Sequence, residues 1–148
     1  MKIKSSAFKD RDVIPKKYTC QGEGFSPPLE FSDIPAETES LVLILEKMAE
    51  EKVIEIDWLV WNINPDEEMF LENSLPDNVI QGENSLALTG YSPPCFDDSN
   101  VYRFRLVALS NLILLREGAD RYQLEQEIRG FIIDEAELFG IVGEPKND

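Results

Sequence analysis

The sequence predicts a mainly β protein with one late helix, organised as a single domain over residues 1–148. Three features predict this class: apolar runs of strand length, stretches in which apolar and polar residues alternate, and Gly- and Pro-rich turns between them. The length of 148 residues fits one domain. A content of 43% hydrophobic and 29% charged residues is typical of a folded globular chain rather than a disordered one.

The first half of the chain contains three strand candidates. Residues 2–7 alternate in the manner of a short edge strand, and residues 40–45 form a continuous apolar run. Residues 53–63 form the strongest candidate, because both of its alternating faces are largely apolar. We therefore expect a central strand that is covered on both sides, with Trp58 and Trp61 on opposite faces.

The second half contains two more strand candidates. Residues 102–109 alternate so that Tyr102 and Arg103 are expected on opposite faces of a strand. Residues 131–141 alternate again, with Ala136 and Leu138 set against acidic neighbours. Both patterns are typical of strands that bury one face.

One segment has the signals of a helix, from Asp120 to residue 129. Asp120 is a plausible N-cap with Gln123 three residues later, which is the spacing of a capping box, and Gly130 suits the C-terminal end. The positions expected to be buried are Tyr122, Leu124 and Ile128.

Charge and composition exclude several function classes. Fourteen basic against 29 acidic residues give a net charge of -15, which argues against binding to nucleic acid or to anionic membranes. The chain has no histidine, which removes the commonest general base, the Ser-His-Asp and Cys-His arrangements and the usual zinc ligand. No motif for a cofactor or a metal ion is present. We therefore predict no enzyme activity, no cofactor and no metal site.

The cysteines and the termini bear on the compartment. Cys20 and Cys95 lie too far apart for a metal motif or a CxxC redox pair. No signal peptide and no transmembrane segment is visible, so we expect a cytoplasmic protein without membrane insertion and with two reduced, buried thiols. A disulfide between the two cysteines is the alternative.

Several segments in consecutive order carry a resemblance to a known family. The segment IPKKYTCQG at residues 14–22 is the most specific, and further matching segments lie at residues 26–29, 58–63, 90–95, 102–109, 118–119, 130–132 and 136–140. Over residues 3–141 the sequence resembles the phosphatidylethanolamine-binding protein family, in its bacterial and archaeal branch often called Raf kinase inhibitor-like. The resemblance implies an antiparallel β-sandwich with a few peripheral helices.

The resemblance also implies a small pocket at one end of the sandwich that accepts phosphate-like head groups. Two histidines of the family pattern fall on Asp57 and Asn100, and the first Asp of its acidic, Pro-containing segment falls on Lys47, or on Glu46 if the register slips by one. The positions that match the pattern are Trp58, Pro94, Cys95 and Tyr102.

The replaced histidines change what the implied pocket would bind. An ionised carboxylate at Asp57 only accepts hydrogen bonds, and two like charges about 4 Å apart repel by about 4 kcal/mol at an effective dielectric constant of about 20. We therefore expect the pocket to have lost phosphate binding. Its oxygen atoms suit a hydroxyl-rich ligand, an amine or a weakly held hard cation such as calcium. The alternative is that Asp57 pairs with a lysine and the pocket is unused.

The function predicted from these residues is a non-enzymatic module that binds a small polar ligand or a protein partner. One alternative is retained head-group binding with kinase- or protease-regulating activity, as the resemblance implies. Another is a hydrolase in which Asp57 works with Glu46 or Asp97 as a carboxylate pair. A homodimer through the apolar residues 111–115 is a further possibility, set against packing of these residues under the C-terminal helix.

Overall fold

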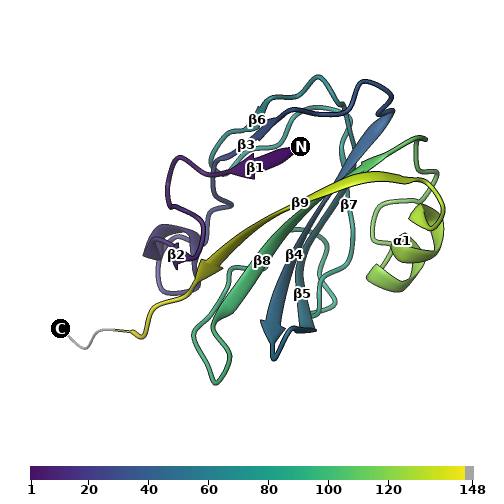
Figure 1. Cartoon of the computed structure of the whole chain (residues 1–148). Helices are drawn as coiled ribbons and strands as arrows, with labels where there is room; N and C mark the ends of the chain where they lie inside the picture. The colour runs from purple at the N-terminus through teal and green to yellow at the C-terminus, as the bar shows by residue number, and fades with distance from the viewer. Residues whose placement is uncertain (146–148) are drawn as a thin grey trace.

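A three-stranded and a six-stranded β-sheet face each other across an apolar core in the computed structural model, which describes residues 1–145 (Figure 1). The small sheet has the order β1-β3-β6, with bounds Lys2–Lys4, Leu29–Ser32 and Met69–Phe70. The large sheet has the order β2-β9-β8-β4-β5-β7, with bounds Asp12–Val13, Ile132–Ile141, Val101–Leu109, Ser40–Ala49, Lys52–Ile63 and Ile80–Gln81.

The predicted mainly β class is confirmed, and the sheet directions need one correction. All named strand pairs are antiparallel except β2 with β9, which run parallel, so the large sheet is mixed. The first predicted strand is an edge strand but ends at Lys4. Ser5 leaves the ladder there, because its hydroxyl donates a hydrogen bond to the Pro28 carbonyl at 2.7 Å.

The predicted helix forms as α1 (Arg121–Ile128), and a short 3-10 helix, η1 (Lys16–Tyr18), precedes Cys20. The capping box is present: the Gln123 N–H donates to the Asp120 carboxylate, and the Asp120 N–H donates to the Gln123 side chain. Leu124 and Ile128 are buried as predicted. Tyr122 is instead 71% exposed, because a residue two positions from Leu124 points to the far side of a helix with 3.6 residues per turn.

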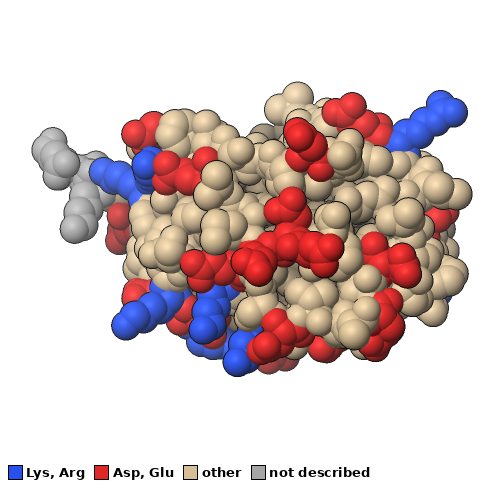
Figure 2. Space-filling view, turned by 90° about the horizontal axis from the view of Figure 1, so that it is seen from above, with Lys and Arg blue, Asp and Glu red and all other residues tan. Residues whose placement is uncertain are grey.

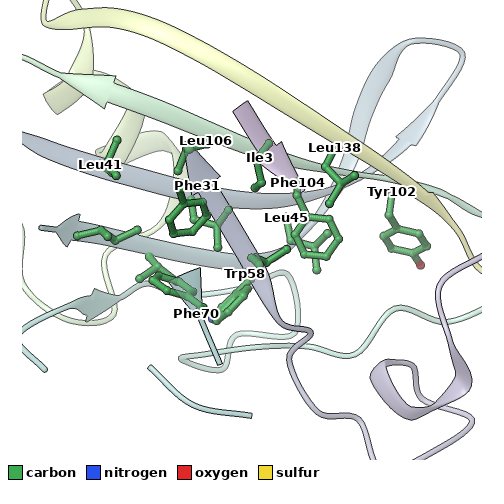
Figure 3. Close-up of a cluster of buried hydrophobic side chains, with 14 of the residues drawn as sticks. Ile3, Phe31, Leu41, Leu45, Trp58, Phe70, Tyr102, Phe104, Leu106 and Leu138 are labelled. Carbon is green, nitrogen blue, oxygen red and sulfur yellow. The ribbon is translucent and has the colours of Figure 1, made fainter. Parts of the chain in front are cut away.

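Two apolar clusters hold the layers together. The first cluster fills the space between the sheets, and Figure 3 shows its aromatic and aliphatic side chains. The second cluster lies on the other face of the large sheet, under α1 and the segment before it. Strand β4 contributes Leu41, Leu43 and Leu45 to the first cluster and Val42 and Ile44 to the second, so its continuous apolar run reflects burial on both faces.

Strand β5 is covered on both faces as predicted, but its alternation is interrupted. The pairing of β4 with β5 shifts register at three places: between Val53 and Glu55, beside Asp57, and near Asn62, whose φ is 55°. Each shift is a β-bulge, which turns the next residues over to the other face. As a result Ile56 lies in the second cluster, whereas Trp58 lies in the first. Trp58 and Trp61 still lie on opposite faces, as predicted.

The apolar run at residues 111–115 is partly buried in the protein and partly exposed on its surface. Ile113 is 2% exposed and packs in the second cluster, and the Asn62 side chain hydrogen-bonds to its backbone N–H and carbonyl. Leu112 and Leu114 are 60% and 92% exposed. Alternate residues of this segment therefore point inward and outward.

The surface agrees with the acidic composition. On the face shown in Figure 2, carboxylates extend across the middle and basic side chains lie toward the two ends. Among residues 1–145, no helix is both long enough and apolar enough to cross a membrane.

Candidate functional site

Lys47, Asp57 and Tyr102, three of the positions that the family resemblance implies for the pocket, lie close together at one end of the first cluster. In the strand register Lys47 of β4 lies opposite Tyr102 of β8 on one side and opposite Glu55 of β5 on the other. The Lys47 ammonium lies 5.6 Å from the centre of the Tyr102 ring. Asp57 reaches the same place because it lies at the bulge of β5 between Ile56 and Trp58. Figure 3 shows Tyr102 at the end of the buried side chains, with its hydroxyl directed away from them.

Asp57 is a buried acid. The residue is 2% exposed, and its Oδ2 atom has no hydrogen-bond donor among the described residues. Burial raises the pKa of the Asp57 carboxyl to about 8, and the Glu55 carboxyl beside it adds to the increase by hydrogen bonding and by repulsion. Lys47 opposes this shift in pKa, and Asp97 adds to it. The raised pKa favours the protonated form of Asp57, which can donate a hydrogen bond, over the ionised form that the sequence analysis expects.

The positive charge of Lys47 is balanced by a carboxylate of the same chain. Its ammonium forms an ion pair with the Asp97 carboxylate, and its side chain is 5% exposed while that of Asp97 is 57% exposed. Burial alone lowers the pKa of Lys47, but hydrogen bonds to Asp97 and Tyr102 outweigh burial and raise it. The hydrogen bond from Lys47, and then that from the Ser99 N–H, lower the pKa of Asp97. The lysine near Asp57 is thus paired with another carboxylate.

A loop formed by residues 93–99, here called the covering loop, closes this cluster. The Tyr102 hydroxyl donates to the Cys95 carbonyl at 2.8 Å and accepts from the Cys95 N–H at 3.1 Å. Pro94 is buried, and its carbonyl accepts from the Cys20 N–H at 3.0 Å. The predicted site residues Pro94 and Cys95 therefore belong to the cover over Lys47 and Asp57.

Cys20 and Cys95 form a disulfide, with their Cα atoms 5.4 Å apart. The expectation of two reduced, buried thiols is therefore wrong, and both cysteines are exposed. The error has a simple cause, since spacing along the chain does not reveal that two loops meet in the folded protein. The Cα separation is within the range that a disulfide requires.

Trp58 is buried in the first cluster, directly after Asp57 in β5. It is 1% exposed, and its indole N–H donates to the Gln81 side chain at 2.8 Å. The ring of Tyr91 meets it edge to face, with the ring centres 5.2 Å apart. The Tyr91 hydroxyl donates to the Tyr18 carbonyl at 2.6 Å. Burial, and next the charge of Asp57, raise the pKa of Tyr91 well above its usual range, so its hydroxyl stays protonated.

Two predicted site residues have other contacts. The Asn100 amide donates to the Val142 carbonyl at 3.3 Å, and the Asn100 carbonyl accepts from the Val142 N–H, so this residue holds the chain after β9. Glu46 lies on the opposite face of β4 from Lys47, because neighbouring residues of a strand alternate. Glu46 is fully buried against Arg103 and Arg105, at 2.8 and 3.3 Å. Lys47 is therefore the residue at the site, and the pairing of Glu46 with Asp57 is wrong.

The sequence prediction did not include Glu55, Gln81 or Tyr91 among the site residues. A signal for Glu55 was present, since it lies two positions before Asp57 in a strand and thus toward the same face. Gln81 and Tyr91 lie in turn-rich sequence, where no periodicity indicates direction. In the part of the chain that is described, no group of three or more Cys, Asp or Glu side chains is arranged to hold a metal ion.

Comparisons with known proteins agree with this fold. The sequence model of the family described as phosphatidylethanolamine-binding protein matches residues 4–143. A UPF0098 protein of Methanothermobacter thermautotrophicus is 38% identical over 148 residues, covering 95% of this chain and 97% of that protein. A UPF0098 protein of Chlamydia trachomatis is 40% identical over 146 residues, with the same two coverages of 95% and 97%.

Two solved structures are similar as well. The crystal structure of a phosphatidylethanolamine-binding protein homologue from Chlamydia trachomatis has a TM-score of 0.90, with 39% identity and 97% of each chain covered. Escherichia coli YbcL, described as a member of the mammalian family, has a TM-score of 0.85 at 20% identity, covering 97% of this chain and 98% of its own, and supports the fold alone. Together with the match over residues 4–143, these similarities place the chain in the phosphatidylethanolamine-binding protein family.

Proposed function

We propose that this protein is a non-catalytic binding module whose inherited head-group site has diverged and, in the state described here, does not bind phosphate. The observation that carries the proposal is the ion pair of Lys47 with Asp97. An anion that entered this site would have to displace a carboxylate of the chain from the cation it needs. Because a buried cation that loses its partner is costly, the internal carboxylate competes strongly with an external one.

The neighbouring residues support the same conclusion. The two histidines of the family pattern are replaced by Asp57 and Asn100, and the Asn100 amide is bonded to Val142. Asp57 brings a carboxyl that would repel an anion whenever it ionises, and Glu55 and Asp97 lie close enough to raise its pKa. A ligand that suits these groups is small and polar, and either neutral or cationic.

Calorimetric titration with phosphate and phosphoethanolamine at neutral pH tests this proposal. We expect no heat of binding at millimolar ligand with the unmodified protein. Asp97→Asn removes the internal carboxylate and leaves the Lys47 ammonium without its partner, so phosphate binding should appear in this variant. Asp98→Asn is the matched control, because it removes an adjacent exposed carboxylate that lies outside the ion pair. Millimolar or tighter binding by the unmodified protein, lost in Tyr102→Phe, would overturn the proposal.

One observation favours the alternative of retained anion binding with a regulatory role toward a kinase or protease. The pKa of Asp57 is raised to about 8, so a protonated carboxyl could donate to an anion at neutral pH. Sulfate keeps one charge state across neutral pH and is the suitable probe. Under this alternative, sulfate binds more tightly at acidic than at alkaline pH, and Asp57→Asn removes the difference.

The remaining functional predictions stay proposals. The hydrolase hypothesis pairs Asp57 with Glu46 or Asp97. Glu46 lies on the other face of β4 and is too far round the strand to act with Asp57, and Asp97 forms an ion pair with Lys47. A homodimer through residues 111–115, of which Leu112 and Leu114 are exposed, stays a prediction. The cytoplasmic location also stays a prediction, and the disulfide weakens its basis because disulfides persist mainly in oxidising compartments.

A further inference from the structure

The disulfide is attached to the loop that lies next to the candidate site. Cys95 is part of the covering loop, and Cys20 belongs to the segment after η1, so the bond ties this loop to a second loop. Both cysteines are exposed to solvent. They are also the two cysteines of the chain, which leaves no third thiol to exchange with them. A solvent-accessible disulfide is open to attack by an external thiolate.

The other attachments of the covering loop are non-covalent and few. Cys95 exchanges two hydrogen bonds with the Tyr102 hydroxyl, Asp97 pairs with Lys47, and the Ser99 hydroxyl donates to the Met48 carbonyl at 2.7 Å. These contacts join the loop to β4 or β8, and the Cys20 N–H donates to the Pro94 carbonyl at 3.0 Å beside the disulfide. The disulfide to Cys20 is the covalent attachment of the covering loop, and it keeps the loop close to the segment after η1 when individual hydrogen bonds open.

What the loop covers is the cluster itself. The Lys47 side chain is 5% exposed, and Asp57 and Tyr102 are 2% and 0% exposed. The covering loop supplies Asp97, which pairs with Lys47. The Asp97 side chain is 57% exposed, so it also faces solvent. Movement of residues 95–97 would therefore uncover the Lys47 ammonium and remove its counter-charge in one step.

We propose that the Cys20–Cys95 disulfide is a redox-controlled latch: reduction releases the covering loop and exposes Lys47 and Asp57, and oxidation closes it. This inference rests on the proposed function in taking Lys47, Asp57 and Tyr102 as the binding site. The reductant is a dithiol, either a small molecule or a protein. Its thiolate attacks one cysteine sulfur, the S–S bond breaks, and the second thiol of the reductant resolves the mixed disulfide. Two electrons and two protons pass to Cys20 and Cys95, and the dithiol becomes a disulfide.

Chemical modification of Lys47 tests the latch without any ligand. The oxidised protein and the dithiothreitol-reduced protein, freed of reductant under argon, are treated with an amine-reactive acetyl ester under native conditions. Peptide mass spectrometry then gives the acetylation rate of each lysine. Because a local constraint is lost, we expect the rate at Lys47 to rise by about tenfold or more on reduction. Lys2, with 63% of its side chain exposed, is the internal reference and should keep its rate.

The double substitution Cys20→Ser and Cys95→Ser is the matched control. It should show the fast Lys47 rate with and without reductant, because the tether is absent in both cases. Asp97→Asn in the oxidised protein removes the ion pair but keeps the disulfide, so it distinguishes their effects. Lys47 should be acetylated more slowly in this variant than in the reduced protein. Hydrogen exchange of the β4 and β8 amides accompanies each measurement. Retained protection there, together with a fast Lys47 rate, supports local opening.

Two results would overturn the latch. One is an unchanged Lys47 rate after complete reduction. The other is loss of amide protection throughout β4 and β8, which would make the disulfide a support for the whole fold. Phosphate titration of the oxidised protein is a separate measurement: binding there contradicts the proposed function whatever Lys47 does. A fast Lys47 rate without phosphate binding in either state supports both proposals.

Discussion

At the scale of single residues, Asp57 shows how position changes chemistry. The sequence places an acid where the family pattern has a histidine, and the simplest expectation is a negative charge that only accepts hydrogen bonds. Burial beside Glu55 raises the pKa of Asp57 to about 8 instead. This raised pKa favours a protonated side chain, which can donate a hydrogen bond, over a carboxylate that repels anions.

This pKa shift predicts a pH dependence of stability. The folded protein keeps the Asp57 proton up to about pH 8, whereas the unfolded chain loses it near the ordinary pKa of 3.8. Between these values the folded state binds more protons, so the free energy of unfolding falls as pH rises. Urea unfolding should show the wild type losing about 1 kcal/mol per pH unit relative to Asp57→Asn over this window.

Asp98→Asn is the control for this measurement, because it removes one acidic charge at an exposed position next to the ion pair. Its stability should follow that of the wild type across the pH range. Parallel curves for the wild type and Asp57→Asn would show that Asp57 ionises in the folded protein as it does in the unfolded chain.

At the scale of elements, β4 separates two kinds of charged residue. Its inner face ends in Lys47 at the candidate site, and its outer face carries Glu46, fully buried against Arg103 and Arg105 of β8. The two arginines also reach Glu137 and Glu135 of β9. This network fixes the register of three neighbouring strands, and through that register it places Lys47 opposite Tyr102.

Removal of the buried carboxylate should therefore destabilise the sheet. In Glu46→Ala, two arginines that are 18% and 17% exposed lose their shared partner, and we expect a loss of about 3 kcal/mol in the free energy of unfolding. Glu135→Ala breaks an ion pair whose carboxylate is 43% exposed and should cost at most about 1 kcal/mol. Urea unfolding at neutral pH compares them. Equal losses in the two variants would contradict a special role for the buried carboxylate.

At the scale of the whole molecule, charge opposes compactness. A net charge of -15 on a chain of 148 residues produces self-repulsion that the folded state has to overcome. Figure 2 shows this excess as carboxylates that lie close together across one face. Salt screens such exposed charges, with a Debye length of about 10 Å at about 0.1 M ionic strength.

We therefore expect the melting temperature to rise when sodium chloride is added up to physiological ionic strength, measured by circular dichroism. The variant with Glu67→Gln and Glu68→Gln carries two negative charges fewer in the turn before β6, so its gain from salt should be smaller. A melting temperature that is unchanged or lowered by salt would mean that repulsion among surface carboxylates does not limit stability.

The fold was largely predictable because its signals are local. Periodicity located β4, β5, β8 and β9, and the capping residues located α1. Tyr122 shows the limit of such signals, since its exposure depends on which stripe of a short helix faces the sheet. The site was predictable in part, because a family pattern supplied Lys47, Asp57 and Tyr102.

The sequence by itself determined the mainly β class, the two-sided burial of the central strands and the residues that replace the family histidines. Tertiary structure alone decided that β5 bulges at Asp57, that Asp97 pairs with Lys47, and that Cys20 meets Cys95. The physical reason is the range of the interactions. Hydrophobic alternation and helix capping act between near neighbours, whereas a bulge, an ion pair between loop and strand and a disulfide depend on how distant segments approach in space.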